Sequence, residues 1–498
     1  MKVLLTTLNS KYVHSALGLK YLYLTGRRAC SALELKEFTI NNSRDYIFTE
    51  LMMGEYDAIC FSCYIWNIGK ILDLAADLKK ADPHLRILLG GPEVSYDAEG
   101  LMKKHREIDF ILTGEGEKSF PMWCRDFEQG GAYSGIPGLF YRTGEWIRSS
   151  APAEPLPMEQ IPSPYETFPC EKDKVIYYES SRGCPFQCSY CISSLDRSMR
   201  RLPLKRVKSD LDCFIQQQVR QVKFLDRTFN WDKKRSREIF RHLISCDQGK
   251  TNFHFEICAD LLDEETLQLL EKARPGLFQF EIGIQSANEK TLQAVNRSSN
   301  IAHVLENVKK LADMGNSHIH TDLIAGLPYE DYISFRRSFN LVYALGADNL
   351  QLGFLKLLKG TGIREQAETY KYMFMEQAPY QVISNRFITA KELCRLKQIE
   401  EVLDLYHNRG GFSRSLEFAV AHMAETPFDF YEKFASYYYE QGFQHRSHKK
   451  EDLYRIFLSF GQAHESSDTL KRLLEADLEQ TMNFDAVKKF KKKGWDIR

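Results

Sequence analysis

The sequence lacks any apolar run that approaches the roughly 20 residues of a membrane-spanning helix. Val3 to Leu5 is too short an apolar run for the core of a signal peptide. Neither sign of charge is in excess, because Lys plus Arg and Asp plus Glu both total 67, so the overall balance indicates neither nucleic acid nor an anionic membrane as a partner. Internal repeats and low-complexity tracts are absent too. We therefore expect a cytoplasmic protein of two or three domains with no membrane partner.

Cysteine is too sparse for a disulfide framework, with 12 residues in a chain of 498, and we expect reduced thiols. Three of them nevertheless stand close together, as Cys184, Cys188 and Cys191, directly after an apolar run at 175–178 that predicts a strand. A structural zinc site needs four ligands, usually with a second Cys-x2-Cys pair downstream, and the sequence has no such pair. Three cysteines can instead hold an iron–sulfur cluster whose remaining iron is open to an outside ligand.

The stretch VIYYESSRGCPFQCSYC at 175–191 resembles the signature loop of the radical S-adenosylmethionine (SAM) superfamily. The resemblance implies that Cys184, Cys188 and Cys191 hold a 4Fe-4S cluster and are the catalytic and metal-binding residues. It also implies that the loop follows the first strand of a partial (β/α)6 barrel. In that family SAM chelates the open iron, and an electron from the cluster cleaves it to methionine and a 5′-deoxyadenosyl radical.

The first 148 residues alternate short apolar runs with helical segments such as 68–80. The predicted strands are KVLLTTL (2–8), YDAICFS (56–62), LRILLGG (85–91) and IDFILTG (108–114), which indicate a doubly wound, Rossmann-like domain. Such sheets bind ligands beyond the carboxyl ends of their strands. A Gly-x-Gly-x-x-Gly motif is missing after the first strand, which argues against an ordinary dinucleotide site. A nucleotide, a flavin, another cofactor or a plain scaffold all stay open on this evidence.

The segments DAICFSCY, LLGGPEVS and DFILTGEGEKSF resemble the cobalamin-binding domain that precedes the barrel in one radical SAM subfamily. The resemblance implies a cobalamin cofactor surrounded by small and polar residues at the strand ends, namely Ser62, Gly90, Gly91, Gly114, Glu115 and Gly116. The sequence lacks the Asp-x-His-x-x-Gly motif of other cobalamin proteins, so a histidine below cobalt is not implied. His14, in the first loop, is either a residue facing the corrin or a packing residue.

Six of the 16 prolines fall between Arg148 and Asp173, which predicts an extended linker over 149–173. From 174 to 362 strands and helices alternate at barrel spacing. After the strand before the cysteines, we predict five more strands at 222–226, 253–259, 278–284, 318–324 and 350–358, which makes the six of a partial TIM-type barrel.

Catalytic and binding groups are expected at the carboxyl ends of the barrel strands. FLDRTFNWD, with Asp226, resembles the family segment that faces SAM or substrate, and EIGIQSANEKTLQAVNR resembles the segment whose glutamine and arginine approach SAM. By that resemblance the SAM-binding residues are Asp226, Glu281, Gln285, Arg297 and Asp322. Each carboxylate has a structural alternative, which is to cap a helix or pair with an arginine.

The remaining residues, 363–498, turn helical, with a capping box at Thr389 and Glu392. We predict a small helical domain packed around aromatic residues such as those at 428–439, or alternatively a lid over the barrel. The cationic run from Arg197 to Lys208 either meets an anionic substrate or pairs with acidic residues of another domain. The overall expectation is an α/β protein with a cobalamin-binding domain, a radical SAM barrel and a carboxyl-terminal helical domain.

The resemblance implies a cobalamin-dependent radical SAM enzyme, more often a methyltransferase acting on an unactivated carbon or a phosphinate centre than an oxidoreductase. An oxidation, cyclisation or rearrangement without methyl transfer is the alternative, and a cobalamin-binding sensor with an inactive barrel is the non-enzymatic one. An electron donor such as flavodoxin or ferredoxin is an expected partner. The substrate, whether small molecule, peptide or RNA, cannot be named from the residues.

Overall fold

The computed structural model describes residues 1–297, 300–464 and 467–495, which form two compact units. Unit 1 comprises residues 1–256 with two later segments, 356–365 and 375–381. Unit 2 comprises residues 257–355, 366–374 and 382–498. The division therefore runs through the strands of the predicted barrel and not between the predicted domains.

Unit 1 begins with a seven-stranded sheet in the order β2-β1-β3-β4-β5-β6-β7. The strands β1 to β5 are parallel, whereas β6 and β7 are antiparallel additions at one edge. Their bounds are Lys2–Asn9 (β1), Ala32–Thr39 (β2), Ala58–Ser62 (β3), Arg86–Gly90 (β4), Phe110–Leu112 (β5), Leu139–Thr143 (β6) and Trp146–Ser149 (β7).

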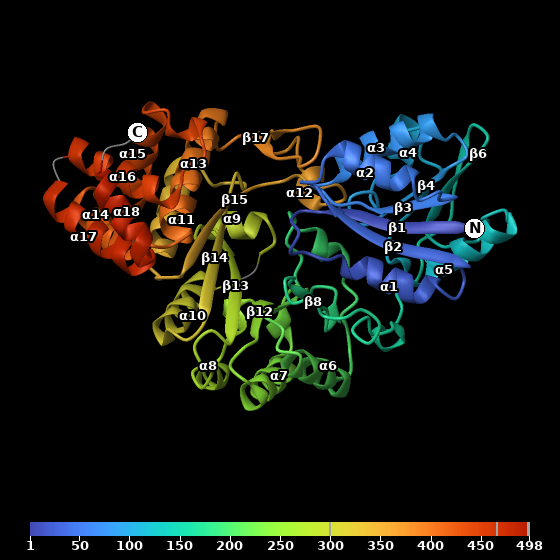
Figure 1. Ribbon diagram of the computed structural model, residues 1–498, viewed down its shortest axis with the longest axis horizontal. Helices are drawn as coiled ribbons and strands as arrows, with labels where there is room; N and C mark the ends of the chain where they lie inside the picture. Colours follow the sequence, from blue (N-terminus) through green and yellow to red (C-terminus); the bar gives the residue numbers. More distant parts are fainter. Residues whose placement is uncertain (298–299, 465–466, 496–498) are drawn as a thin grey trace. The chain divides into compact units, whose positions relative to one another are not determined.

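Helices cover both faces of this sheet, as Figure 1 shows. The buried residues of α2 (Arg44–Met52), α3 (Ile68–Ala81) and α4 (Ala98–Lys104) pack into one apolar core. Those of α1 (Leu17–Gly26) and α5 (Gly116–Gln129) pack into a second core on the opposite face. Because both faces are covered, seven of the eight residues of β1 are buried, which explains the continuous apolar pattern of its sequence.

The predicted doubly wound domain is confirmed, but three of its strands, β2, β6 and β7, are not predicted from the sequence. The strand β2 has the sequence ALELKEFT and only one fully buried residue, since it lies at the end of the sheet. Charged residues alternate along β2, and the strands β6 and β7 bury few residues. None of the three therefore has the apolar pattern that predicts a strand. The strand order reverses between β1 and β3, and the carboxyl ends at such a point are where open α/β sheets bind ligands.

Between β7 and β8 (Ile176–Tyr178) the chain forms a single turn of 3-10 helix, η1 (Met158–Gln160). It then enters a second sheet, in which β8 pairs in parallel with β11 (Gln221–Phe224) and β11 with β12 (Asn252–Glu256). The helices α6 (Leu204–Gln216) and α7 (Lys233–Cys246) connect these strands. The cysteine loop lies between β9 (Ser181–Arg182) and β10 (Arg200–Arg201), which pair antiparallel and close its base.

Unit 2 contains three further parallel strands, β13 (Phe278–Gln285), β14 (His318–Ala325) and β15 (Asn349–Phe354). All six strands predicted for the second domain are thus present, three in each unit. In β13 and β14 buried residues alternate with half-buried ones, so that one face of the strands packs against helices. The helices here are α8 (Glu264–Leu270), α9 (Glu289–Ala294), α10 (Ile301–Met314) and α11 (Tyr332–Tyr343).

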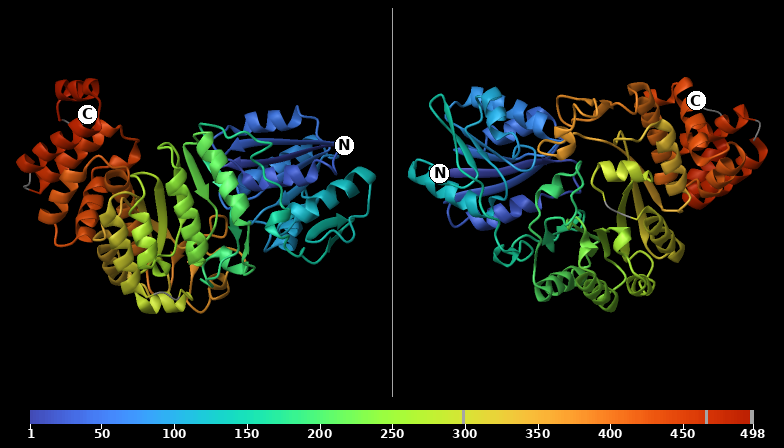
Figure 2. Two further views of the ribbon diagram at one scale, coloured as in Figure 1. Left: turned by 90° about the horizontal axis from the view of Figure 1, so that it is seen from below. Right: turned by 180° about the vertical axis from the view of Figure 1, so that it is seen from behind.

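The chain ends in a helical group, shown in Figure 2, as the sequence predicts. It follows α12 (Gly362–Glu365) and a short antiparallel pair, β16 (Met373–Phe374) and β17 (Val382–Ser384). Its helices are α13 (Ala390–Leu403), α14 (Ser413–His422), α15 (Pro427–Glu440), α16 (Lys450–Ala463), α17 (Ser467–Thr481) and α18 (Phe484–Lys493). The predicted capping box at Thr389 and Glu392 is present. No helix in the described residues is long and apolar enough to cross a membrane.

One side chain of the helical group pairs with the backbone of the edge strand β15. A single π-helical turn, Asp404–Asn408, follows α13 and brings Asn408 against the strand. The Asn408 amide accepts from the Leu350 N–H at 3.0 Å and donates to the Leu350 carbonyl at 3.0 Å. Both backbone groups of a buried edge residue are thereby paired as they would be by a further strand.

We predict that Asn408→Ala loosens this edge. Loss of both hydrogen bonds leaves the buried Leu350 backbone unpaired, at a cost of about 1–3 kcal/mol. Amide hydrogen exchange should therefore become about tenfold faster in the peptide that contains Leu350. The neighbouring change Arg409→Ala removes an exposed ion pair with Asp404 and should leave this peptide unaffected. Equal exchange in both variants would contradict the edge-pairing role of Asn408.

Candidate functional site

Unit 1 holds a cavity of about 420 Å³ at the carboxyl ends of β3, β4 and β5. One side is formed by the loops that follow these strands and the other by the segment that carries the cysteines. All of the residues predicted to surround a cofactor in the first domain line this cavity, namely Ser62, Gly90, Gly91, Gly114, Glu115 and Gly116. The cavity is therefore a shared space between the first domain and the cysteine loop.

The inner part of the cavity is apolar and lies between the sheet and the helices α1 and α5. Its lining side chains are Leu5, Leu19, Leu22, Cys60, Leu88, Leu112 and Phe120. Two glycines keep this space accessible. Gly91 has a φ of +97°, and a Cβ there would lie 2.7 Å from the Cys63 carbonyl oxygen; a Cβ on Gly116 would lie 2.8 Å from Leu22.

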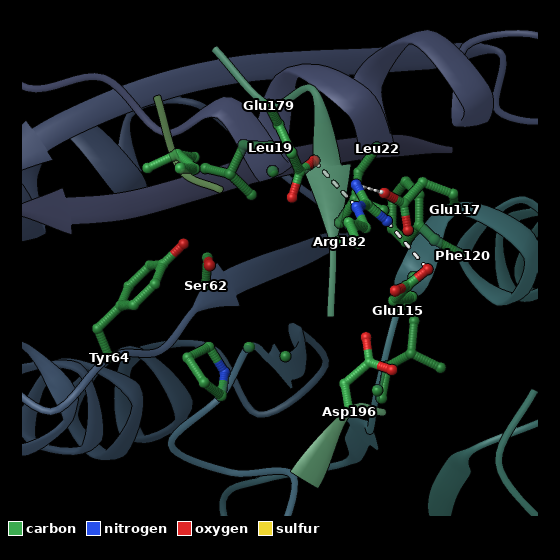
Figure 3. A pocket seen from close by; sticks show the side chains of 18 of the residues that line it. Leu19, Leu22, Ser62, Tyr64, Glu115, Glu117, Phe120, Glu179, Arg182 and Asp196 are labelled. Carbon is green, nitrogen blue, oxygen red and sulfur yellow. Dashed lines mark hydrogen bonds and ion pairs between the residues drawn. The ribbon is translucent and has the colours of Figure 1, made fainter. Parts of the chain in front are cut away.

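The outer part is polar, and Tyr64 reaches into it beside Ser62 (Figure 3). The Tyr64 ring stacks on Trp66, with centroids 4.5 Å apart and an interplanar angle of 6°. Burial raises the pKa of the Tyr64 hydroxyl, so it stays protonated near neutral pH. The sequence reading did not single out Tyr64, although its place two residues after the end of β3 was the available signal.

His14 is accounted for by packing. Its Nδ1 lies 2.7 Å from the Tyr177 hydroxyl, and it is not among the residues that line the cavity. The packing interpretation of this histidine therefore describes the structure, and the corrin-facing one does not.

Arg182 occupies the opposite wall of the outer cavity, two residues before Cys184, and contacts three carboxylates (Figure 3). Its guanidinium lies 2.9 Å from Glu179, 2.7 Å from Glu117 and 2.9 Å from Glu115. Burial raises the pKa of Glu179 to about 7, against the opposing effect of Arg182. The first domain and the segment before the cysteines are thus joined by charged contacts at the cavity wall.

The cysteine loop carries its three thiols in buried or half-buried positions. Cys184 and Cys188 are buried and Cys191 is half-buried. Burial raises the pKa of Cys184, and the nearby Cys191 and Cys188 raise it further. The Thr228 hydroxyl lies 3.7 Å from the Cys184 sulfur, within reach of a weak hydrogen bond. Three thiols on one loop, near enough for Cys188 and Cys191 to affect the pKa of Cys184, are a suitable ligand set for a cluster, because metal binding would replace their protons.

The turn at Gly183 and the segment 356–365 fix the loop. Gly183 has a φ of +91°, and a Cβ there would lie 2.5 Å from the Ser198 carbonyl oxygen. The Cys184 N–H donates to the Asp196 carbonyl at 3.1 Å, and the Ile363 N–H donates to the Ser189 carbonyl at 2.9 Å. The loop is held by backbone contacts on both sides.

Asp226 is buried behind the loop. Its carboxylate accepts from the Ser180 N–H at 2.8 Å and from the hydroxyls of Ser180 and Ser181 at 2.6 and 2.5 Å. Burial raises the pKa of Asp226 even though these hydrogen bonds act in the other direction. These contacts support the strand segment that leads into the cysteine loop.

The cationic run after the cysteines pairs mostly with neighbouring acidic side chains. Arg200 contacts Glu115, Arg201 contacts Asp232, and Lys208 lies 3.1 Å from Glu238. The alternative in which this run pairs with acidic residues, one of them in the first domain, is the one that the structure shows.

In unit 2 the predicted residues Glu281, Gln285 and Asp322 lie on the same face of β13 and β14. Gly283 is the register partner of Asp322, and Glu281 stands two positions before Gly283. The register shifts between Gly283 and Gln285, and the Gln285 amide turns back to the Cβ side of Gly283. Arg297 donates to the Gly283 carbonyl. A Cβ on Gly283 would lie 2.1 Å from Gln285 Nε2 and 3.8 Å from an Arg297 nitrogen, so the glycine lets these two side chains converge.

Gln285 has two features of a binding residue. Its φ is +72°, which is strained for a residue with a side chain. Its Oε1 atom is buried, and no group in the described part of the chain donates a hydrogen bond to it. A buried amide acceptor of this kind is costly unless a ligand supplies the donor.

Comparison with known protein families identifies each segment of the chain. Residues 3–122 match the B12 binding domain, and residues 178–342 match the radical SAM superfamily. The chain contains a radical SAM domain and a B12-binding domain. Residues 368–496 match a protein family of unknown function, DUF4080. The resemblance seen in the sequence is therefore confirmed for both of its functional domains.

The chain has relatives of known name and known fold. It is 26% identical over 354 residues to the cobalamin-dependent radical SAM methyltransferase TokK of Streptomyces tokunonensis, a match that covers 65% of this chain and 51% of TokK. The chain spans about half the length of the curated relatives it matches.

Two solved structures show the same fold. The cobalamin-dependent SAM radical enzyme OxsB, with aqua-cobalamin bound, superposes with a TM-score of 0.66 at 14% identity and covers 99% of this chain and 83% of its own. The radical SAM methyltransferase TsrM from Kitasatospora setae, with tryptophan and a SAM analogue bound, has a TM-score of 0.60 at 17% identity, covering 74% of this chain and 76% of its own. The predicted fold class is confirmed.

Glu330 is a further buried acid that the sequence reading missed. It follows Gly326, Leu327 and Pro328 in the loop after β14 and is 1% exposed. One carboxylate oxygen accepts from Ser286 at 2.9 Å and from Ser338 at 2.8 Å. Burial raises the pKa of Glu330 to about 7, which these hydroxyls only partly oppose.

We predict that Glu330 makes the folded protein less stable as pH rises. The folded state retains a proton that the unfolded state releases above its ordinary pKa of about 4.3, so stability is lost between there and pH 7, by roughly 2–3 kcal/mol. Glu330→Gln, which cannot ionise, should gain stability relative to wild type at pH 8 compared with pH 5. Thermal unfolding at both pH values measures this.

The control is Glu289→Gln, which changes an exposed acid on α9. Its stability relative to wild type should be the same at pH 5 and pH 8. If the difference between Glu330→Gln and wild type were the same at pH 5 and pH 8, the raised pKa would be wrong.

Proposed function

We propose that this chain is an enzyme that uses a 4Fe-4S cluster, SAM and cobalamin, and that it methylates an unactivated carbon or a phosphinate centre. The observation that carries the proposal is the cavity in unit 1. A single space is lined both by the strand-end loops of the B12-binding domain and by the segment that holds the three cysteines. Two cofactors bound there would lie within one compact unit.

The donor sets in unit 1 fit the two proposed groups. Cys184, Cys188 and Cys191 would hold the cluster and leave one iron open for SAM. The apolar inner part of the cavity suits the flat base of the cobalamin nucleotide, and the polar outer part suits the corrin side chains. None of the residues that line the cavity in the described chain is a histidine, so no histidine in that set would bind cobalt from below.

Gln285 and Arg297 are the proposed contacts for the methionine end of SAM. A guanidinium binds a carboxylate in two-point geometry, and the buried Gln285 oxygen would accept from an ammonium group. Glu281 and Asp322, on the same face of the strands, would accept from the SAM amine or ribose hydroxyls. Asp226 would support the segment that leads into the cysteine loop.

Bound in this way, the cluster would supply the electron that cleaves SAM, and cobalamin would supply the methyl group. Methyl transfer by this route is suited to carbon or phosphorus centres that are not nucleophilic enough to attack SAM directly. An electron donor such as flavodoxin or ferredoxin would be the partner that reduces the cluster. We assign the B12-binding domain to residues 1–148, a linker to 149–173, the barrel to 174–362 and the helical domain to 363–498.

We predict that Cys188→Ala abolishes SAM cleavage. Loss of one of three ligands prevents stable assembly of the cluster, so reconstituted protein should contain less iron and release no 5′-deoxyadenosine when reduced with dithionite. Cys394→Ala, which changes an exposed cysteine on α13, is the matched control and should match wild type. Undiminished 5′-deoxyadenosine from Cys188→Ala would overturn this assignment of the cluster ligands, whereas wild-type protein that releases none would favour the sensor alternative.

A pair of glycine variants tests cobalamin binding. Gly18 and Gly69 are each the second residue of a helix, α1 and α3, and neither has an atom within 4 Å of its added Cβ. Only Gly18 lines the cavity. Gly18→Leu should lower bound cobalt about tenfold because the new side chain occupies the apolar part, whereas Gly69→Leu should not.

Metal analysis gives cobalt and iron for both glycine variants. Iron should be unchanged in each, since neither glycine is near the cysteines in sequence and none of the three cysteines lines the cavity. Full cobalt binding by Gly18→Leu would place cobalamin outside this cavity. Cobalt binding with SAM cleavage but no methylated product would favour the alternative of oxidation, cyclisation or rearrangement.

A further inference from the structure

Charged side chains join the B12-binding domain to the cysteine loop, and the role that we infer for them rests on the proposed function. The loop is closed at its base by the antiparallel pair β9 and β10, in which Arg182 stands directly opposite Arg200. Like charges in directly opposed positions of an antiparallel pair destabilise it. Some acidic group must therefore compensate both guanidinium groups if this base is to remain closed.

The compensating group is Glu115, which belongs to the other domain. One of its carboxylate oxygens lies 2.9 Å from Arg182 and 3.0 Å from Arg200, and its second oxygen also contacts Arg200. The side chains of Arg182 and Arg200 are only 11% and 15% exposed. One carboxylate thus bridges two buried cations across the base of the loop.

The Glu115 side chain forms this bridge and does not cap its own helix. It is the N-cap residue of α5, a position whose side chain often accepts from the first backbone N–H groups of the helix. In this structure the Glu115 side chain makes no such capping hydrogen bond. Its backbone instead forms part of the strand-end loop that lines the cavity, beside Gly114 and Gly116.

Neighbouring groups add to the bridge without replacing it. Glu117 and Glu179 contact the other two guanidinium nitrogens of Arg182, and Asp196 lies 3.3 Å from Arg200. Each of these carboxylates contacts only one of the two arginines among the described ion pairs. Among these ion pairs Glu115 is the carboxylate that contacts both arginines, and so it is the one that bridges the opposed pair.

We propose that Glu115 is a positioning residue that sets the distance between the cobalamin loop and the cluster loop. Its carboxylate joins Arg182 and Arg200, at the base of the loop with the three cysteines, to the loop after β5 that faces cobalamin. The sequence reading placed Glu115 against the cofactor itself. In this assignment it acts through the two arginines, and the cofactor contacts are made by the backbone and by its neighbours.

The test compares Glu115→Gln with wild type and with Glu34→Gln. Glutamine keeps the size of the side chain and removes its charge, so Arg182 and Arg200 are left opposed. Glu34 is an exposed acid of the same domain that pairs with Lys2 at 3.1 Å, away from the cavity, and serves as the matched control for loss of one charge.

The first readout needs no cofactor. Amide hydrogen exchange in cofactor-free, full-length protein should become about tenfold faster in Glu115→Gln over peptides that contain β9 and β10, and should be unchanged in Glu34→Gln. Unchanged exchange over both strands in Glu115→Gln would overturn the proposal, whether or not the protein binds cobalamin.

The second readout uses the loaded protein. In reduced enzyme, the magnetic interaction between cob(II)alamin and the reduced cluster reports the separation of the two cofactors by electron paramagnetic resonance. In Glu115→Gln both metals should load as in wild type while this interaction weakens. More 5′-deoxyadenosine should then form per methylated product, by about tenfold, since a shift of 1 Å can cost up to about 10²-fold in rate.

The possible outcomes separate the two proposals. Specific loss of cobalt from Glu115→Gln would mean that its side chain contacts cobalamin, and would overturn the positioning role. Normal loading with an unchanged magnetic interaction would overturn it as well. Wild-type protein that binds no cobalt would defeat the proposed function, and the exchange measurement would still decide whether Glu115 holds the loop.

Should Glu115→Gln fail to fold, Glu115→Asp provides the same test. Aspartate keeps the charge on a side chain one methylene shorter, which can reach one arginine but not bridge both at their present distances. Its exchange over β9 and β10 should lie between wild type and glutamine. Exchange equal to wild type would again overturn the bridging role.

Discussion

The structure depends on one geometric property of parallel sheets, which is that all carboxyl ends of the strands meet at the same edge. In unit 1 this property gathers the loops after β3, β4 and β5 around a single cavity. The cysteine loop follows β8, which belongs to a second parallel sheet in the same unit. Residues from 5 to 227 thereby line one space, although few of them are close in sequence.

Joining the two sides of that space requires burying charge, which is favourable only when each charged group finds a partner. The wall at Arg182 meets this requirement with carboxylates from both sides: Glu115 and Glu117 from the first domain, and Glu179 from the strand segment before the cysteines. Burying these charged groups costs free energy of desolvation, and the arrangement is stable only because every charged group has a partner. It therefore specifies one geometry of the wall.

At the carboxyl-terminal helices, buried backbone groups are paired in the same way that the buried charges are. The edge of β15 offers unpaired backbone groups, and the π-helical turn places Asn408 where its amide satisfies both of them at Leu350. The helical group otherwise holds together through a dense aromatic core that includes Tyr406, Phe434 and Phe457. Core packing, one of the two interpretations of its aromatic segments, accounts for these residues.

Much of the fold was predictable because its signals are local. Buried strands such as β1 and β13 carry continuous or alternating apolar residues, and Thr389 caps its helix as the sequence indicates. The strand β2 escaped because an edge strand buries little, so its charged residues gave it no apolar signature. Tyr64 was not predicted although it follows a strand end, and Glu330 was not predicted because nothing in its immediate sequence shows that it is buried in a loop.

The sequence by itself determined the cysteine spacing, the glycines at the strand ends and the order of the domains, because each of these is a short-range pattern. Only the tertiary structure decided which charges meet. Arg182 and Glu115 are 67 residues apart (182 − 115), and their partnership depends on two sheets folding so that their loops face one cavity. An ion pair acts over a few ångströms and leaves no trace in the spacing of residues along the chain, so the residues that join the two halves of the site became visible only in the folded protein.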